Sequence, residues 1–165
     1  MIVKRNQILA YLPRERWYQR QIAYWSGIYR HIGIAYNHEL IFDARFTGIR
    51  LNPIDYRDTF HIYELSEEAQ RYFNEEKAWH WALQPPPAGP YGTRYDYLGL
   101  IGYLFREKRL QHPGRWFCSE LLRKFLEVGG IAIPFPLPSP TDITNLSFLT
   151  LIGGNNAKTG VKTRA

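Results

Sequence analysis

The sequence predicts an α+β domain in which a small antiparallel β-sheet packs against a few helices. Three observations carry this prediction. Between residues 31 and 65, four short stretches rich in β-branched and aromatic residues read as strands separated by turn residues. Later stretches return to the 3.6-residue spacing of helices. The 165 residues are 45% hydrophobic and 16% aromatic, which is enough to bury one core.

The strands and the first helix follow one another closely. The predicted strands are 31–36, 39–44, 48–56 and 60–65. Ser66 is a predicted N-cap, because Glu67 and Glu68 follow it where a helix N-terminus favours negative charge. We expect that helix to continue to about Leu83 and to stop before Pro85.

The second half of the chain alternates between proline-rich and helical stretches. We expect a stiff loop over 84–93, a helix over 95–110, a second helix over 119–127 ending at Gly129, and an extended stretch over 133–140. Residues 1–150 are predicted to form one domain that includes a basic N-terminal segment, 1–28. Residues 151–165 are predicted to be a basic, extended tail.

The positive charge lies at the two ends of the chain. The net charge is +6, and residues 1–30 carry six basic side chains and one acidic, a local charge of +5. Residues 153–165 carry three basic side chains and no acidic one, a local charge of +3. Basic ends favour contact with an anionic partner or with protein partners in a larger assembly, and they are equally compatible with a solvated surface.

Several classes of function find no support in the sequence. No apolar stretch reaches the roughly 18 residues of a membrane span, and the N-terminus lacks the pattern of a signal peptide, which indicates cytoplasmic synthesis. No phosphate-binding loop, dinucleotide fingerprint or nucleic-acid recognition motif occurs. One cysteine excludes an internal disulfide and a multi-cysteine zinc site, and the five histidines lack metal-ligand spacing. We therefore expect no metal and no cofactor.

Cys118 is the strongest candidate for chemistry. It lies where a helix is predicted to begin, and the positive end of a helix dipole stabilises a thiolate. Arg115, Trp116 and Phe117 precede it and supply one charge and two large apolar groups. The alternative is a buried structural cysteine that behaves as a small hydrophobic residue.

Strand alternation supplies a candidate base for this thiol. If the hairpin between the first two predicted strands is centred on Asn37, apolar residues face apolar residues, and His31 faces Asp43. A carboxylate that accepts from one imidazole nitrogen leaves the other nitrogen free to act on sulfur. Glu39 shares the face of Asp43 but lies near the turn, so Asp43 is preferred as the third residue.

Three motifs resemble a known family when taken in this order. They are RHIGI at 30–34, YDYLG at 95–99 and FCSEL at 117–121. Together they resemble the circularly permuted branch of the NlpC-type papain-like superfamily, especially its YiiX-like members, over roughly residues 28–145. In that branch the histidine strand comes first and the cysteine, at a helix start, comes much later. The third residue there is often glutamate, whereas this sequence has Asp43.

The resemblance implies a permuted papain-like fold and a cysteine peptidase or amidase with Cys118 as nucleophile, His31 as base and Asp43 as orienting residue. It implies a peptide bond in the stem peptides of bacterial peptidoglycan as substrate. Bacteriophage tail components occur among proteins of this type, so a virion location is one expectation. Tyr95, Ser119 and Glu120 are candidates for contacting the substrate or the oxyanion, although Glu120 also suits a helix cap and Tyr95 a core position.

Two alternatives remain at this point. The permuted branch also includes lecithin–retinol acyltransferase-like proteins, which move acyl groups on lipids through a thioester, and the aromatic N-terminal segment would suit a membrane surface. Alternatively, the domain is a non-catalytic part of a virion or another assembly, with its basic ends bound to neighbouring chains.

Overall fold

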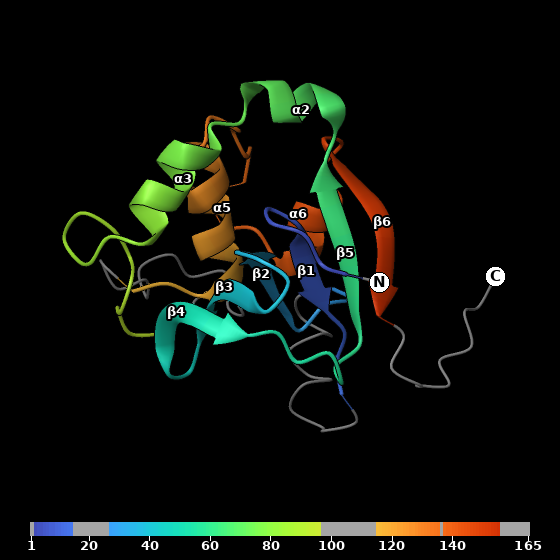
Figure 1. Ribbon diagram of the computed structural model, residues 1–165, viewed down its shortest axis with the longest axis horizontal. Helices are drawn as coiled ribbons and strands as arrows, with labels where there is room; N and C mark the ends of the chain where they lie inside the picture. Colours follow the sequence, from blue (N-terminus) through green and yellow to red (C-terminus); the bar gives the residue numbers. More distant parts are fainter. Residues whose placement is uncertain (1, 15–26, 97–114, 136, 156–165) are drawn as a thin grey trace.

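The computed structural model describes residues 2–14, 27–96, 115–135 and 137–155. Its centre is one six-stranded antiparallel sheet with strand order β4-β3-β2-β1-β5-β6 (Figure 1). The strands are β1 (Ile8–Tyr11), β2 (His31–Ala35), β3 (Leu40–Arg45), β4 (Gly48–Pro53), β5 (Phe60–Leu65) and β6 (Leu149–Asn155). The described helices are α2 (Glu67–Tyr72), α3 (Glu75–Ala82), α5 (Cys118–Val128) and α6 (Pro140–Thr144). The predicted α+β class is confirmed.

The sheet contains the four strands predicted from the sequence and two that were not predicted. β1 pairs with β2 on one side and with β5 on the other, so it lies in the middle of the sheet. All four of its residues are buried, and a short run that is apolar on both faces has no alternation to identify it. β6 pairs with β5 at one edge. The predicted boundary at residue 150 therefore lies inside β6, and residues 151–155 belong to the sheet.

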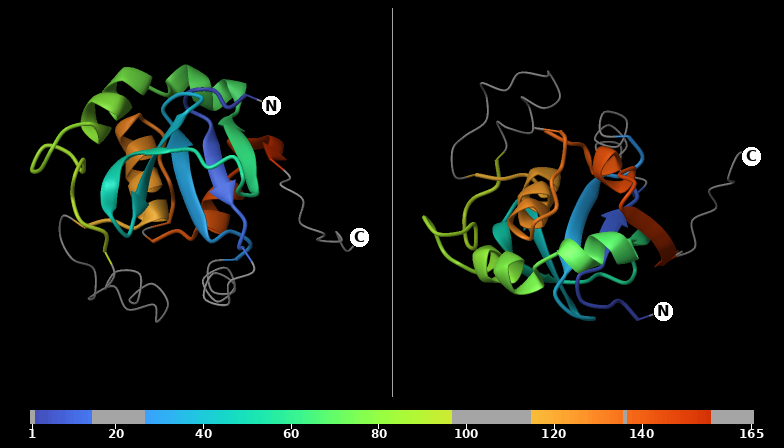
Figure 2. Two further views of the ribbon diagram at one scale, coloured as in Figure 1. Left: turned by 60° about the horizontal axis from the view of Figure 1, so that its bottom comes forward. Right: turned by 90° about the horizontal axis from the view of Figure 1, so that it is seen from above.

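The two faces of the sheet bury separate apolar clusters. On one face, side chains such as Ile32, Ile34 and Phe42 pack with the helices α3, α5 and α6 (Figures 1 and 2). On the other face, Leu9, Tyr11 and other strand residues pack with Val3 and Ile54 from flanking segments; the remaining members are Ala35, Ile41, Phe60 and Ile62. The sheet is thus covered on both sides, as a buried central strand requires.

The helix predicted from Ser66 to Leu83 is two helices. Ser66 does cap α2, because its side chain accepts from the amide of Ala69. The chain then leaves the helix at Phe73, and Asn74 caps a new helix by accepting from the amide of Lys77 at 2.8 Å. The Asn74 amide itself donates to the carbonyl of Gly129 at 2.7 Å. A second capping residue followed by two glutamates was the overlooked signal.

The helix α5 supports the functional region. It was predicted at 119–127 and spans Cys118–Val128, with Gly129 as the predicted C-cap. Its buried side chains recur at helical spacing: Leu121, Leu122, Phe125 and Leu126. The proline-rich stretch predicted as extended leads directly into α6, which begins at Pro140 behind a capping box of Ser139 and Asp142. In the helix predicted over 95–110, residues 97–110 lie outside the described residues.

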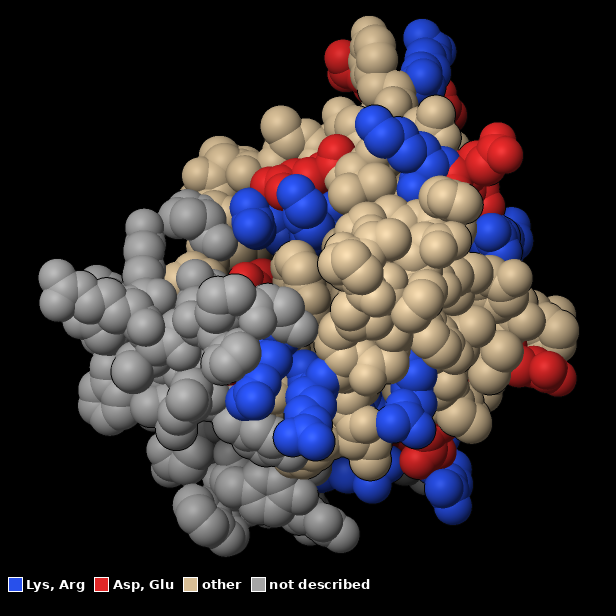
Figure 3. Space-filling model, turned by 90° about the vertical axis from the view of Figure 1, so that its left-hand side faces the viewer, with Lys and Arg blue, Asp and Glu red and all other residues tan. Residues whose placement is uncertain are grey.

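Charge is mixed on the face of the molecule that carries α3 and β4. Figure 3 shows Lys and Arg side chains there in separate groups, with acidic side chains among several of them. The described parts of this face therefore present no single basic patch. No described helix has the length and apolar character needed to cross a membrane.

The first prediction concerns the contact between α5 and the sheet. Phe125 is fully buried, and its ring lies 4.8 Å from that of Trp79 and 6.5 Å from that of Phe42, measured between ring centroids. Phe125→Ala should lower the free energy of unfolding by about 3–5 kcal/mol, since truncating a buried aromatic leaves a cavity. Tyr72→Ala, at a 70% exposed position, is the matched aromatic control. Urea unfolding measures both variants, and equal effects would contradict the packing described here.

Candidate active site

The strands β2 and β3 bring His31 and Asp43 together, but in a different register from the predicted one. Ile34 pairs with Phe42 and Ala35 with Ile41, so each residue of β3 pairs two positions further along β2 than in the register centred on Asn37. Asp43 lies opposite Gly33, and His31 is its diagonal neighbour on the same face. The register prediction was wrong, yet the two side chains still meet, because a shift of two residues preserves the face of every side chain.

Gly33 makes this approach sterically feasible. A Cβ atom at Gly33 would lie 2.8 Å from the Cβ of Asp43 and 2.7 Å from Cδ1 of Ile41. Neither distance is compatible with van der Waals packing, so a larger residue would displace the strand β3 or the Asp43 side chain. The glycine of the HIGI motif therefore provides the space in which the carboxylate turns toward His31.

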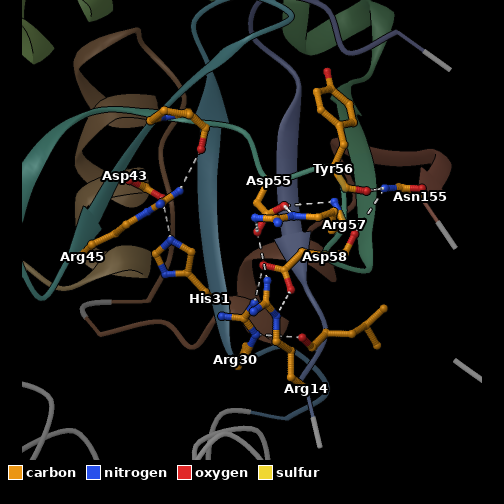
Figure 4. Close-up of polar contacts among 12 residues, drawn as sticks. Arg14, Arg30, His31, Asp43, Arg45, Asp55, Tyr56, Arg57, Asp58 and Asn155 are labelled. Carbon is orange, nitrogen blue, oxygen red and sulfur yellow. Dashed lines mark hydrogen bonds and ion pairs between the residues drawn. The ribbon is translucent and has the colours of Figure 1, made fainter. Parts of the chain in front are cut away.

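The His31–Asp43 contact is a short, buried hydrogen bond. Nε2 of His31 lies 2.8 Å from Oδ2 of Asp43, and the carboxylate is fully shielded from solvent (Figure 4). Burial alone would raise the pKa of Asp43, but the hydrogen bonds and charges of His31 and Arg45 lower it below its usual range. Asp43 is thus a carboxylate that orients the ring.

Cys118 also interacts with the imidazole of His31. It is the first residue of α5 and is 8% exposed. Burial alone would lower the pKa of His31, but hydrogen bonding and charge from Asp43 and Cys118 raise it to about 9. Because Asp43 occupies Nε2, Nδ1 is the ring nitrogen left for the sulfur. The structure therefore places the three predicted residues in one chain of contacts: Asp43, His31 and Cys118.

The start of α5 is capped from within its own first turn. Phe117 is the N-cap, and its side chain makes no capping hydrogen bond. The carboxylate of Glu120 accepts from the Phe117 backbone amide, as a residue in the first turn does in half of a capping box. Burial and the charge of Asp96 raise the pKa of Glu120 to about 7, against the effects of the Phe117 amide and Arg123. Glu120 is thus the helix cap that the sequence also suggested.

The other candidate contact residues are engaged in packing. The Ser119 hydroxyl, 1% exposed, donates to the carbonyl of Pro138 at 2.6 Å and ties α5 to the segment before α6. Tyr95 is buried, pairs with Trp116 in an isolated bridge, and packs its ring edgewise against Phe46. The Glu39 side chain is 73% exposed and lies 3.6 Å from Nε2 of His38, at the turn.

Sequence reasoning missed three residues that surround the triad. Nε of Arg45 donates to Oδ2 of Asp43 at 2.9 Å, and Nδ2 of Asn52 donates to Oδ1 at 2.6 Å. The ring of Tyr11 packs against His31, with centroids 5.7 Å apart. Arg45 follows Asp43 by two residues, so strand alternation could have placed it on the same face. The other two depend on pairings that the sequence did not reveal.

A charged cluster holds the start of β2 in place. Asp58, 8% exposed, accepts from Nε of Arg14 and, at 2.9 Å, from Nη2 of Arg30, the residue before His31 (Figure 4). Nε of Arg30 also donates to the carbonyl of Leu12 at 2.9 Å. Asp58 therefore joins the segments after β1 and before β2, which fixes the position from which His31 projects.

The described residues contain no group of three or more His, Cys, Asp or Glu side chains arranged to hold a metal ion. No protein-family model matches the chain. Comparison with curated proteins likewise found no match.

The second prediction concerns the pH dependence of stability. The pKa of His31 is about 9 in the folded protein and about 6.5 in an unfolded chain, so the folded state binds the proton more tightly. The stability that His31 contributes is therefore complete below about pH 6.5 and is lost as the pH rises through about 9. It amounts to at most about 3.4 kcal/mol.

Urea unfolding of the protein and of His31→Gln, repeated across this pH range, measures the effect. The difference in free energy of unfolding between the two should shrink as the pH rises. A difference that is constant with pH would contradict the raised pKa of His31.

Proposed function

We propose that the protein is a cysteine hydrolase that cleaves an amide bond through Cys118, His31 and Asp43. One observation carries the proposal: a thiol at a helix start interacts with an imidazole whose far nitrogen is held by a buried carboxylate. A nucleophile, a base in contact with it and a group that orients the base are the parts that covalent acyl transfer needs.

In the proposed first step, the Cys118 thiolate attacks the carbonyl carbon of the amide and forms a C–S bond. The carbonyl oxygen becomes an oxyanion, and backbone amides at the start of α5 are its proposed donors. His31, protonated at Nδ1, gives that proton to the leaving nitrogen as the C–N bond breaks. The products of this step are a free amine and a thioester on Cys118.

In the proposed second step, neutral His31 removes a proton from a water molecule, and the hydroxyl oxygen attacks the thioester carbon. The C–S bond breaks, the acid product leaves, and the thiolate and imidazolium form again. Asp43 keeps its charge throughout, because it accepts from Nε2 whether or not Nδ1 is protonated.

The proposed fold and substrate come from the resemblance of RHIGI and FCSEL to the permuted NlpC-type branch. A sheet with the histidine on one of its strands and a later helix that starts at the cysteine agrees with a permuted papain-like arrangement. The proposed substrate is a peptide bond in bacterial peptidoglycan stem peptides. A virion tail or another assembly is the proposed carrier, bound through the basic N-terminal segment and C-terminal tail.

The third prediction tests the nucleophile. The purified protein should release new amino groups from peptidoglycan fragments, whereas Cys118→Ala should lose this activity, because no other thiol is present in the chain. Phospholipid vesicles assayed in parallel report lipid acyl transfer or hydrolysis instead. If neither substrate reacts and iodoacetamide does not modify Cys118 at neutral pH, the proposal fails.

The fourth prediction separates the two carboxylates near the hairpin. Asp43→Asn should reduce kcat by at least roughly tenfold, since the amide places the wrong ring tautomer toward the sulfur. Glu39→Gln, which removes an exposed carboxylate from the turn between the same two strands, should leave kcat unchanged. Equal rates for Asp43→Asn and the unaltered protein would remove Asp43 from the mechanism.

A further inference from the structure

One oxygen of the buried Asp43 carboxylate accepts hydrogen bonds from two basic side chains. Oδ2 accepts from Nε2 of His31 at 2.8 Å and from Nε of Arg45 at 2.9 Å. Oδ1 accepts from Nδ2 of Asn52 at 2.6 Å. A carboxylate oxygen has two lone pairs, so His31 and Arg45 fill the accepting capacity of Oδ2. Figure 4 shows the guanidinium of Arg45 and the imidazole of His31 close to Asp43.

Arg45 is the last residue of β3 and lies two residues after Asp43, on the same face of the strand. Arg45 pairs with Gly48 of β4. Its Nη2 also lies 3.4 Å from the carbonyl of Pro53, on the neighbouring strand. The Arg45 side chain is 37% exposed, whereas the Asp43 side chain is completely shielded. The Arg45 side chain is therefore partly in contact with solvent while it binds the buried carboxylate of Asp43.

We propose that Arg45 is a positioning residue that limits how strongly Asp43 holds the proton of His31. If the imidazolium were the only cation beside the buried carboxylate, the carboxylate would strongly favour the protonated form of His31. The negative charge of Asp43 would then be compensated only while His31 keeps its proton. Arg45 compensates that charge whether His31 is protonated or neutral. The imidazole can then lose its proton without leaving an unpaired buried anion.

For catalysis, this inference rests on the proposed function. With Cys118 as thiolate and His31 as imidazolium, the four groups Cys118, His31, Asp43 and Arg45 alternate in charge and sum to zero. After the thioester forms and the leaving amine takes the proton, only Asp43 and Arg45 remain charged, and they too sum to zero. Arg45 thus favours the transfer of the proton from His31 to the leaving group.

Other groups that face His31 do not share this oxygen. Tyr11 packs on the ring from β1, and Cys118 approaches from α5. Arg30 and Asp58 interact with Tyr11 and pair with each other. Among the described residues, Arg45 is the cation bound directly to Asp43 besides His31.

The fifth prediction tests the inference by measuring the pKa of His31. The titration is monitored by NMR of the imidazole signals in full-length Cys118→Ala protein. The His31 signal is identified by its loss in His31→Gln. Arg45→Met should raise the pKa of His31 by about half a unit to one unit, since a neighbouring cation disfavours the imidazolium. Arg45→Gln, which keeps an N–H donor without the charge, should raise it by a similar amount and serves if the Met variant does not fold.

Arg50→Met is the matched control. Arg50 pairs with Asp43 across β3 and β4, but its Nη2 donates to the carbonyl of Thr47, and the side chain is exposed. Its removal should shift the pKa of His31 by less than about 0.2 units. If both neutral Arg45 variants leave the titration of His31 unchanged or lower its pKa, the inference is overturned.

The role of Arg45 in the titration of His31 and the proposed function can be contradicted independently of each other. Because the titrated protein lacks Cys118, its result stands even if the unaltered protein cleaves nothing. In active protein, Arg45→Met should slow an amide substrate more than a nitrophenyl ester, whose leaving group needs no proton. Equal slowing of both substrates would contradict a role in proton transfer.

Discussion

The buried carboxylate of Asp43 is the constraint around which this region of the protein is organised. An anion shielded from solvent is stable only when donors saturate it, and here three side chains donate to its two oxygens. Those donors come from β2, β3 and β4. The hydrogen bonds that the Asp43 carboxylate needs therefore tie three adjacent strands together. Gly33 completes the arrangement, because a side chain there would occupy the space of the carboxylate. The orientation of His31 follows from this packing.

Much of the candidate site could be predicted because side-chain direction in a strand has a period of two. The predicted hairpin register was wrong by two residues, yet His31 and Asp43 stayed on one face and within reach. A shift of one residue would have separated them. The approach of Cys118 could not be derived in this way, since it depends on how α5 docks against the sheet. Arg45 and Asn52 were missed because polar residues on strands are usually interpreted as solvent-facing.

The errors in the predicted fold also have physical causes. β1 is four residues long and buried on both faces, so its sequence carries no periodic signal, although it lies at the centre of the sheet. The break between α2 and α3 depends on Asn74, which caps the second helix and also donates from its backbone to Gly129, far away in the chain. Helix propensity alone favours continuity there, and the tertiary contact decides against it. β6 is specified by its pairing with β5, which a local pattern does not reveal.

The placement of His31, Asp43 and Cys118 on rigid elements links their arrangement to the stability of the fold. His31 stands on a strand that is paired on both sides, by β1 and β3, and the preceding Arg30 is anchored by Asp58. Cys118 begins a helix whose position is set by Phe125 against Trp79 and Phe42. The distance between sulfur and imidazole is therefore determined by the packing of α5 on the sheet rather than by a mobile loop. Groups held in this way would need little reorganisation during the proposed reaction. It follows that a substitution in the core beneath α5 can alter the contact between Cys118 and His31 without touching either residue.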